Sequence, residues 1–388
     1  MLEYPLSDEH KMLRDTIRDF VKNEIAPHAR DLDEQAQFPL EIFKKMAELG
    51  FIGAAIPSEY GGSGMDLMAV YLVVEELATV LPSLAMDYMV TAGVIAYGSI
   101  YKLGTDAQRK KYLQKLVRGE MIGAIGMTEP NAGSDVANMK TRAIKGENGN
   151  YLLNGAKTLI TNFGAPLPSV GVFITVTDPD RGTKGMTSFL VEKDFPGVTV
   201  SREIETCGMR SSSQAEISFE DCPVPAENLM VGKGRGMMVS LSGIDVDRIL
   251  CCALSTGIAR GAYERALKYA HERVVFGQHV VDFQSVQLML SKMATYIHAS
   301  RLLGHHAVGV YEQGKRCTLE AAMAKRVASR HAQDATMWAM HILGGYGYCR
   351  EYEVERFFRD NMGVEIGGGA ADILEVVIAR SVIDSPTI

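Results

Sequence analysis

The spacing of apolar residues changes twice along the chain, and this double change constrains the fold more than any other feature. Over the first 120 residues the apolar positions recur every three or four residues, as in amphipathic helices. From about Met121 short β-rich runs replace this pattern, with Asn-Gly pairs as turns between neighbouring runs. From about Gly236 long helical patterns return. We therefore predict an α+β fold with an N-terminal helical domain over residues 1–120, a middle β domain over residues 121–235 and a C-terminal antiparallel helical bundle over residues 236–388.

Composition narrows the classes of function. The 388 residues carry 47 acidic and 40 basic side chains, and the net charge of −7 argues against a nucleic-acid-binding protein. The longest stretch without a charge, residues 158–177, contains Gly and Pro and cannot form a membrane-spanning helix. The sequence starts without a basic segment followed by an apolar leader. We therefore expect a cytoplasmic protein that does not insert into membranes.

The six cysteines and nine histidines do not form a metal-binding pattern. No Cys-x-x-Cys pair and no His-Glu-x-x-His segment occurs, and Cys251 and Cys252 are adjacent. We interpret the cysteines as reduced thiols and expect no metal site.

Several segments with chemistry-bearing residues occur in a specific order. They are 127–135 (MTEPNAGSD), 157–162 (KTLITN), 273–277 (RVVFG) followed by 282–284 (DFQ), and 342–348 (ILGGYGY) followed by 356–360 (RFFRD). None of the glycine clusters has the spacing of a Rossmann or P-loop motif. In this order and spacing, over the whole chain, the segments resemble the acyl-CoA dehydrogenase family, a group of FAD flavoproteins.

The resemblance implies that FAD binds between the β domain and the helical bundle of a homotetramer, with each flavin touching a neighbouring subunit. Residues implied to line the flavin and the thioester are Met127, Thr128, Ser134, Leu159, Ile160 and Thr161, together with Ala370 and Asp372. Residues implied to reach the pyrophosphate and adenosine of a neighbour's FAD are Arg273, Phe276, Gln284, Gly344 and Gly345. An arginine fork and glycine backbone also suit a pyrophosphate on chemical grounds.

The resemblance further implies an acyl-CoA thioester as substrate and an electron-transferring flavoprotein as partner. Asp245 and Arg248 resemble a CoA-contacting Asp-x-x-Arg, although an intrahelical ion pair is the alternative. Ser134, Thr91 and Gly367 are implied to border the acyl thioester.

The chain departs from the family at the catalytic base. Counting from Arg359-Asp360 and back from Arg380 places Gly368 where most members have a Glu, and Ala370 replaces the usual Thr. The backbone N–H of Gly368 still has the capacity to polarise a thioester carbonyl. Proton abstraction at the usual place therefore needs another carboxylate, and two are available.

Asp247 is one candidate, because isovaleryl-CoA dehydrogenases also have Gly at the usual position and place a Glu here. This acid would support ordinary α,β-dehydrogenation of a branched-chain or cyclohexanecarboxyl-CoA, although aspartate is one methylene shorter. A helix-surface acid is the structural alternative for Asp247. A non-catalytic FAD or acyl-CoA binding protein is the alternative from another class.

Asp87 is the other candidate, since its helical neighbours Leu84, Val90, Thr91 and Val94 form an apolar stripe with one small residue. Its place in the family borders the acyl cavity, so a buried carboxylate with a raised pKa is expected there. An acid that only favours the first turns of a helix is the structural alternative for Asp87. A base remote from the α-carbon suits a thioester whose α-carbon has no hydrogen. We therefore predict 1,4-elimination on cyclohex-1-ene-1-carboxyl-CoA to a cyclic 1,5-diene, with Asp87 as base and hydride transfer to flavin N5.

Overall fold

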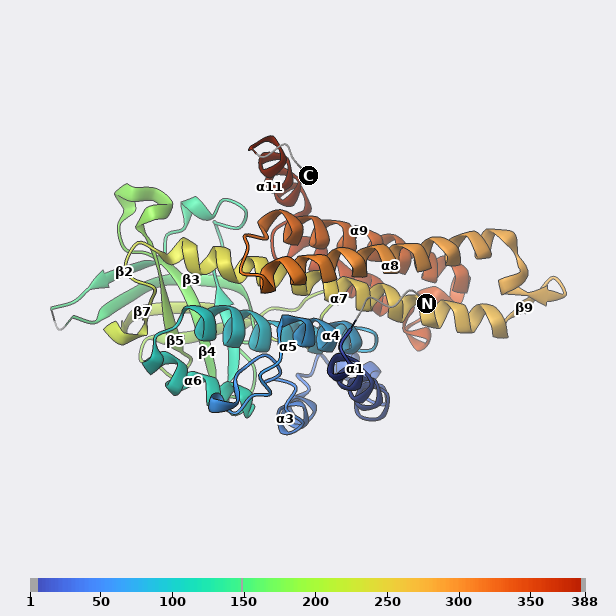
Figure 1. The fold of residues 1–388 in the computed structure, drawn as a ribbon, viewed down its shortest axis with the longest axis horizontal. Coiled ribbons are helices and arrows are strands. Elements are labelled where there is room, and N and C mark those ends of the chain that lie inside the picture. Colours follow the sequence, from blue (N-terminus) through green and yellow to red (C-terminus); the bar gives the residue numbers. More distant parts are fainter. Residues whose placement is uncertain (1–5, 148, 385–388) are drawn as a thin grey trace.

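The computed structural model describes residues 6–147 and 149–384, apart from the side chains of residues 237–242. The sheet lies at one end of the molecule, three long helices extend from it to the other end, and the N-terminal helices lie along one side (Figure 1). This helix–sheet–helix order confirms the predicted α+β fold. In the described part of the chain, no helix combines the length and apolar character that crossing a bilayer requires.

The N-terminal part is helical throughout. Its elements are α1 (Asp8–Phe20), the π-helix η1 (Val21–Ile25), α2 (Ala29–Gln35), α3 (Leu40–Glu48), α4 (Leu67–Ala78), α5 (Pro82–Tyr88), the π-helix η3 (Met89–Tyr101) and α6 (Asp106–Val117). Ser7 caps α1 by accepting a hydrogen bond from the backbone N–H of His10 at 3.2 Å. Thr105 and Gln108 form a capping box at the start of α6.

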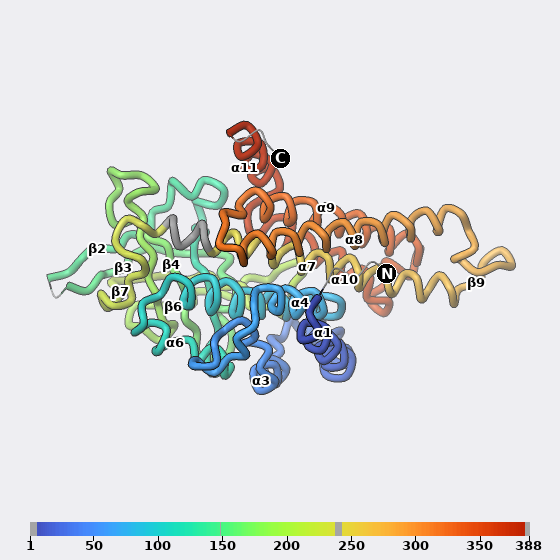
Figure 2. Tube along the Cα trace, viewed as in Figure 1, coloured from blue at the N-terminus to red at the C-terminus, as the bar shows by residue number. Residues whose placement is uncertain are grey.

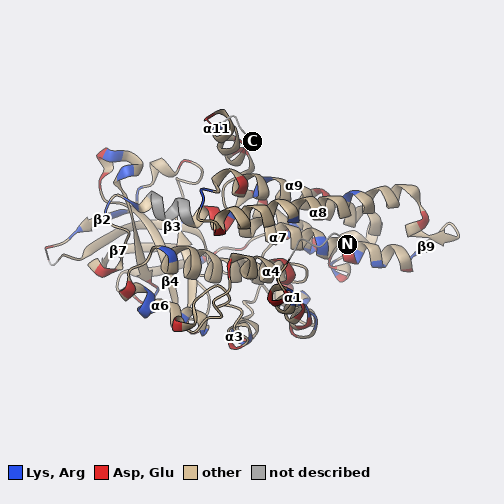
Figure 3. Ribbon diagram, viewed as in Figure 1, with Lys and Arg blue, Asp and Glu red and all other residues tan. Residues whose placement is uncertain are grey.

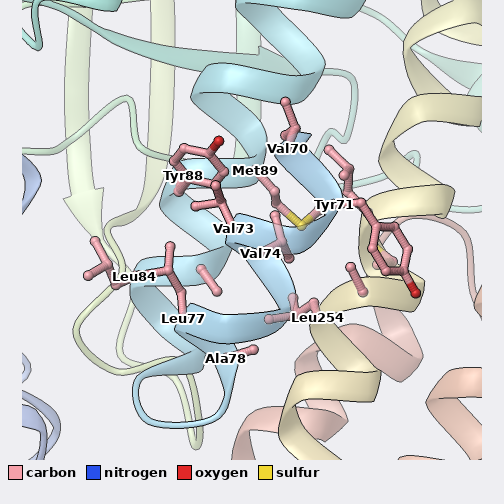
Figure 4. Packing of buried hydrophobic residues seen from close by; sticks show 14 of the residues in the cluster. Val70, Tyr71, Val73, Val74, Leu77, Ala78, Leu84, Tyr88, Met89 and Leu254 are labelled. Atoms are coloured by element: carbon pink, nitrogen blue, oxygen red, sulfur yellow. The ribbon is translucent and has the colours of Figure 1, made fainter. Parts of the chain in front are cut away.

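Helix α4 is mostly apolar and is enclosed by other helices. All its residues are buried, and it packs against α1, α5 and α7. Figure 4 shows Val70, Val73, Val74 and Leu77 of α4 among side chains of neighbouring helices, including Leu254 of α7. The start of η3 and the end of α5 are held against this core.

The β domain is one mixed sheet. Its strands are β1 (Ile122–Gly126), β2 (Arg142–Lys145), β3 (Tyr151–Thr161), β4 (Ser169–Val176), β5 (Met186–Glu192), β6 (Val198–Glu203), β7 (Gln214–Val224) and β8 (Leu229–Met230). The order is β6-β7-β3-β2-β4-β5-β8, and β1 pairs with β4 in parallel. The β3–β7 register shifts between Lys157 and Ile160. Such a bulge redirects side chains, and this one lies in a segment predicted to face the flavin.

The C-terminal part is a bundle of long helices. Its elements are α7 (Gly236–Glu272), the hairpin of β9 (Val274–Val275) and β10 (Gln278–His279), α8 (Gln284–Glu312), α9 (Thr318–Leu343), α10 (Val354–Ile366) and α11 (Ala371–Asp384). Short 3-10 turns cover Ser58–Tyr60, Val136–Asn138, Pro179–Gly185, Ala226–Asn228, Val280–Asp282, Gly344–Tyr348 and Arg350–Tyr352. The 37 residues of α7 extend about 55 Å, so the β9–β10 hairpin lies at the end opposite the sheet (Figure 2).

A buried ion-pair network joins the N-terminal helices to the bundle. Charged residues mark outer helices such as α1 and α6 (Figure 3), but Glu75 on α4 is buried. It accepts hydrogen bonds from Arg260 at 2.9 Å and from Arg301 at 2.7 Å. Although burial alone would raise the pKa of Glu75, Arg301 and Arg260 lower it to about 2. The network fixes α4 against α7 and α8.

Candidate active site

Two neighbouring segments of the β domain contain most residues predicted to line the flavin. The backbone N–H of Thr158 donates to the Thr128 carbonyl at 3.0 Å, which aligns segment 127–134 with β3. Leu159 has a φ of 57° and a side chain that is 54% exposed, an unusual state for an apolar residue in a strand. Backbone outliers of this kind occur at functional sites. Leu159 therefore offers an apolar surface to a ligand.

Because of the bulge in β3, the side chains next to Leu159 point in different directions. Ile160 is 1% exposed and its side chain belongs to the sheet core, so only its backbone is available to a flavin. Thr161 and Met127 are half-buried, and Ser134 is exposed in the loop before η4 (Val136–Asn138). The structure thus brings together Met127, Thr128, Leu159 and Thr161, while Ile160 points inward.

A buried lysine holds these two segments together. Lys157 is fully buried, and its ammonium donates to Glu129 at 2.9 Å and to the Met127 carbonyl at 3.1 Å. Burial lowers the pKa of Lys157 to about 8, against the attraction of Glu129. Breaking one partner of such a pair leaves a buried charge uncompensated. The pair therefore fixes the segment 127–129, a role that spacing in the sequence did not indicate.

The residues predicted for the pyrophosphate and adenosine lie at the far end of the bundle. Arg273, Phe276, Gly344 and Gly345 line one cavity of about 550 Å³. Phe276 is 96% exposed, and Arg273 lies over the Tyr346 ring with 5.7 Å between guanidinium carbon and ring centroid. A Cβ at either glycine would meet nothing within 4 Å, so the space above them is open. These donors and exposed aromatic surfaces fit a dinucleotide.

Gln284, the first residue of α8, is exposed but does not line this cavity. The cavity beside the β9–β10 hairpin and the β-domain segments predicted to line the flavin lie toward opposite ends of the 37-residue helix α7 (Figure 1). One FAD in a single chain therefore cannot contact both. The two groups of residues predicted to contact FAD thus lie at opposite ends of the chain's long helix α7.

The turn after α10 carries Gly368, the position of the missing Glu. A Cβ on Gly368 would stand 2.5 Å from Asp247 Oδ2, and its φ is 63°. Glycine is therefore required for Asp247 to occupy this place. The Lys325 ammonium donates to the Gly369 carbonyl at 2.7 Å and to the Glu365 carbonyl at 3.3 Å, which fixes the turn.

Asp247 has the electrostatics of a functional carboxylate. Burial raises its pKa to about 6, and the nearby cations of Lys325 and Arg248 oppose the rise. Cys251 Sγ lies 3.9 Å from Asp247 Oδ2. A strongly shifted acid with specific charged neighbours is a candidate functional residue.

Asp245 and Arg248 form only a loose intrahelical pair, 3.9 Å apart. Asp245 instead accepts a hydrogen bond from Thr318 at 2.9 Å. Arg248 is buried and its Nε has no partner among the described residues. An orphaned buried guanidinium nitrogen fits a site that awaits an acceptor group. Gly367 is exposed beside this region, Ala370 is half-buried, and Asp372 lies exposed in the first turn of α11.

Asp87 lies in a different place, at the end of α5. It is 0% exposed, and burial raises its pKa well above the usual value, with only a hydrogen bond to Ser212 opposing the rise. Ser212 Oγ donates to Asp87 Oδ1 at 2.5 Å, and Oδ2 has no partner among the described residues. Asn162 at the end of β3 donates to the Asp87 carbonyl at 3.0 Å.

Thr91 lies one turn beyond Asp87, in η3. Its hydroxyl is buried and accepts hydrogen bonds from Asn162 Nδ2 at 3.2 Å and from the Gly123 N–H at 3.3 Å. The Thr91 methyl group and hydroxyl hydrogen are what remain for the predicted acyl contact. π-helical turns are frequent at functional sites. Asp87 is therefore a buried acid joined by Asn162 to the strand that carries Thr161.

Ser212 and Gln214 are the site residues that sequence reasoning missed. Gln214 Nε2 donates to Thr161 Oγ1 at 3.0 Å and to Ser212 Oγ at 3.3 Å. No motif marks either residue, because their roles depend on contacts across more than 50 positions of the chain.

Three family models match consecutive parts of the chain. The acyl-CoA dehydrogenase N-terminal domain matches residues 7–120, the middle domain residues 124–222 and the C-terminal domain residues 234–383.

Curated proteins and solved structures resemble the chain over nearly its whole length. An acryloyl-CoA reductase (NADH) of Anaerotignum propionicum is 40% identical over 98% of this chain and 96% of its own. A cyclohex-1-ene-1-carbonyl-CoA dehydrogenase of Syntrophus aciditrophicus is 37% identical over 97% of this chain and 91% of its own. The structure of butyryl-CoA dehydrogenase from Megasphaera elsdenii superposes with a TM-score of 0.95 and 35% identity, covering 98% of this chain and 100% of that chain.

Proposed function

The chain belongs to the acyl-CoA dehydrogenase family of FAD-dependent oxidoreductases, and from this premise we propose that it dehydrogenates an alicyclic acyl-CoA by 1,4-elimination, with Asp87 as the base. The substrate class is a cyclohex-1-ene-1-carboxyl thioester and the product a cyclic 1,5-diene. FAD, when bound, supplies the acceptor for the hydride equivalent. The observation that carries the proposal is the buried carboxyl of Asp87, one oxygen of which has no hydrogen-bond partner in the described part of the chain.

The substrate determines where a base must stand. A 1-ene-1-carboxyl thioester has no hydrogen on its α-carbon, so a base near the usual position has no proton to remove. The γ-carbon is the acidic position, because its carbanion is conjugated with the thioester. Asp87 is placed apart from the Gly368 turn: its contacts are Ser212 and Asn162, whereas Asp247 contacts Gly368.

The environment of Asp87 suits a weakly acidic C–H. A carboxylate with a raised pKa is a stronger base than an ordinary aspartate. Its apolar neighbours also exclude water from the proton transfer, since Val90, Val94 and Leu84 are buried. The likeness to a cyclohex-1-ene-1-carbonyl-CoA dehydrogenase, at 37% identity, supports this substrate class, and the acryloyl-CoA reductase, at 40%, shows that relatives with other names are at least as similar.

Asp247 favours a second candidate function, ordinary α,β-dehydrogenation of a branched-chain or cyclohexanecarboxyl-CoA. Its carboxylate stands beside Gly368, and its pKa of about 6 leaves it ionised at neutral pH. For the 1-ene substrate, Asp247 would instead act with Arg248 in positioning the thioester end.

Assembly and electron transfer complete the proposal. A homotetramer would bring the Arg273–Phe276 cavity of one subunit to the flavin-lining segments of another, and the length of α7, about 55 Å, supports such sharing between subunits. The electrons must leave the reduced cofactor before the next turnover, and an electron-transferring flavoprotein is the proposed acceptor.

The test compares two isosteric variants by the rate of anaerobic flavin bleaching. With a cyclic 1-ene thioester, we expect Asp87→Asn to slow bleaching by about 10²–10⁴-fold and Asp247→Asn to slow it much less. The reverse ranking would refute Asp87 as base and support α,β-dehydrogenation. Absence of bleaching of the wild-type flavin by 1-ene and saturated thioesters alike would favour a binding protein without dehydrogenase activity.

A further inference from the structure

The two oxygens of the Asp87 carboxyl have different environments. Oδ1 accepts a 2.5 Å hydrogen bond from Ser212, whereas Oδ2 is buried and has no partner among the described residues. Buried carboxyl groups that only support packing normally have both oxygens satisfied. The unpaired Oδ2 is therefore the oxygen available to a substrate.

Gln214 sets the direction of the Ser212 hydroxyl. Its Nε2 has two hydrogens and two acceptors, Thr161 Oγ1 at 3.0 Å and Ser212 Oγ at 3.3 Å. Because an N–H points at the Ser212 oxygen, the hydrogen of that hydroxyl is directed to Asp87. A chain of hydrogen bonds thus runs from the flavin-facing strand β3 to the buried acid.

We propose that Ser212, oriented by Gln214, is a positioning residue that holds Oδ1 of Asp87 as an acceptor and reserves Oδ2 for the proton taken from the substrate. This inference rests on the proposed function of Asp87. In the step concerned, the C–H bond at the γ-carbon breaks, an O–H bond forms at Oδ2, and the electron pair stays on the substrate as the thioester dienolate. Ser212 stabilises the carboxylate before the transfer and loses part of that interaction when the acid is neutral.

The charged and titratable groups around α5 pair with residues other than Asp87. Among the described residues, Ser212 is therefore the hydrogen-bond donor that opposes the rise in the Asp87 pKa. No charged residue occurs in η3, and Tyr88 donates to the Phe51 carbonyl. The other groups on the packed elements pair as follows: Glu75 and Glu76 with Arg260, Arg301 with Glu75, Lys157 with Glu129, Asp360 with the Met209 N–H, Arg356 with the Val80 carbonyl, and Arg210 with the Asp33 carbonyl. On α7, Asp247 and Cys251 contact each other at 3.9 Å.

The experiment is the pH dependence of flavin reduction in the FAD-loaded full-length protein, with a cyclohex-1-ene-1-carboxyl thioester as the reductant. The wild-type rate should rise with pH as Asp87 ionises. A hydrogen bond to a charged group moves a pKa by about one to two units. In Ser212→Ala the rate of flavin reduction should therefore increase at a pH that is higher by about one to two units than in wild type. The rate should be about 10–100-fold lower on the acid limb and should recover at high pH.

Matched variants separate positioning from packing. Ser211→Ala removes the neighbouring buried hydroxyl, which hydrogen-bonds to Ser83 at 2.5 Å, whereas the hydroxyl that donates to Asp87 is that of Ser212, so the pH profile of Ser211→Ala should stay as in wild type. Ser212→Thr retains a hydroxyl and should restore most of the profile. Gln214→Met removes the amide that orients Ser212, and a smaller shift in the same direction is expected. FAD content and circular dichroism establish that each variant is folded.

The outcomes distinguish this inference from the function on which it rests. If Asp87→Asn abolishes flavin reduction but Ser212→Ala has the wild-type pH profile, the role of Ser212 is refuted and Asp87 remains the base. A loss in Ser212→Ala that is equal at every pH would also refute it, because a packing defect does not depend on Asp87 ionisation. If Asp87→Asn reduces flavin at the wild-type rate, the proposed function itself is wrong.

Discussion

Replacing Asp247 with Asn should make the protein more stable at neutral pH. The wild-type carboxylate is half-buried beside Gly368, where desolvation raises its pKa to about 6 from the ordinary 3.8. Functional acids of this kind are often maintained at a cost in stability. Asparagine has nearly the same shape and remains neutral, so it avoids the cost of a buried charge.

The size of the effect follows from linkage between protonation and folding. The folded-state pKa lies above the unfolded value, so the folded protein binds more protons than the unfolded chain between about pH 4 and pH 6, and stability falls as pH rises through this window. A shift of about two units corresponds to about 3 kcal/mol at pH 7.5 and about half of that at pH 5. At an unfolding entropy of about 2.1 cal/mol/K per residue, 3 kcal/mol raises Tm by roughly 4 °C if the whole chain unfolds as one unit.

The assay is thermal unfolding of FAD-loaded wild type and Asp247→Asn at pH 7.5 and pH 5, followed by circular dichroism. The gain in Tm should be clear at pH 7.5 and about half as large at pH 5. Asp15→Asn, at a carboxylate that is 64% exposed, is the control and should show little change at either pH. A destabilised Asp247→Asn, or a gain that does not depend on pH, would refute the burial argument.

Two further predictions concern the framework and the cofactor. Glu75→Gln should lower the free energy of unfolding by about 3 kcal/mol at pH 7, because the Glu75 pKa is lowered to about 2. This loss of stability should disappear as the pH falls from 4.5 through 2. In the same denaturation experiment, Glu264→Gln should change little, because Glu264 is a 58% exposed partner of the same Arg260. An unchanged Glu75→Gln protein at pH 7 would contradict the network's role. Arg273→Gln should weaken FAD binding by about 10–100-fold, measured as the FAD retained after gel filtration. Arg118→Gln, which changes a 59% exposed arginine, is the control and should retain its FAD. Full retention of FAD by Arg273→Gln would show that Arg273 does not bind the pyrophosphate.

The division into helices, sheet and helices was predictable because it depends on local periodicity. The motif segments were predictable because each is a short run of fixed residue types. The outward turn of Leu159 and the inward turn of Ile160 were not, since a bulge between Lys157 and Ile160 reverses the alternation that a regular strand would give.

The partners of the two candidate bases were also beyond sequence reasoning. Asp87 meets Ser212, which is 125 positions away, and neither lies in a recognisable motif with the other. The presence of Gly at position 368 could be recognised from the sequence. However, Asp247 lies 2.5 Å from where a Cβ of residue 368 would stand, and this depends on how α10 and α7 pack. Similarly, the exclusion of Gln284 from the cavity of Arg273 depends on the direction of the first turn of α8.

Anaerobic mixing of the FAD-loaded protein with cyclohex-1-ene-1-carboxyl-CoA and, separately, with cyclohexanecarboxyl-CoA tests 1,4-elimination directly. The product of each reaction is identified by mass spectrometry and NMR. We expect rapid bleaching of the flavin by the 1-ene thioester, with one equivalent of the conjugated 1,5-diene thioester formed for each flavin reduced. Bleaching by the saturated thioester alone, with a 1-ene product, would contradict 1,4-elimination and assign the chemistry to Asp247.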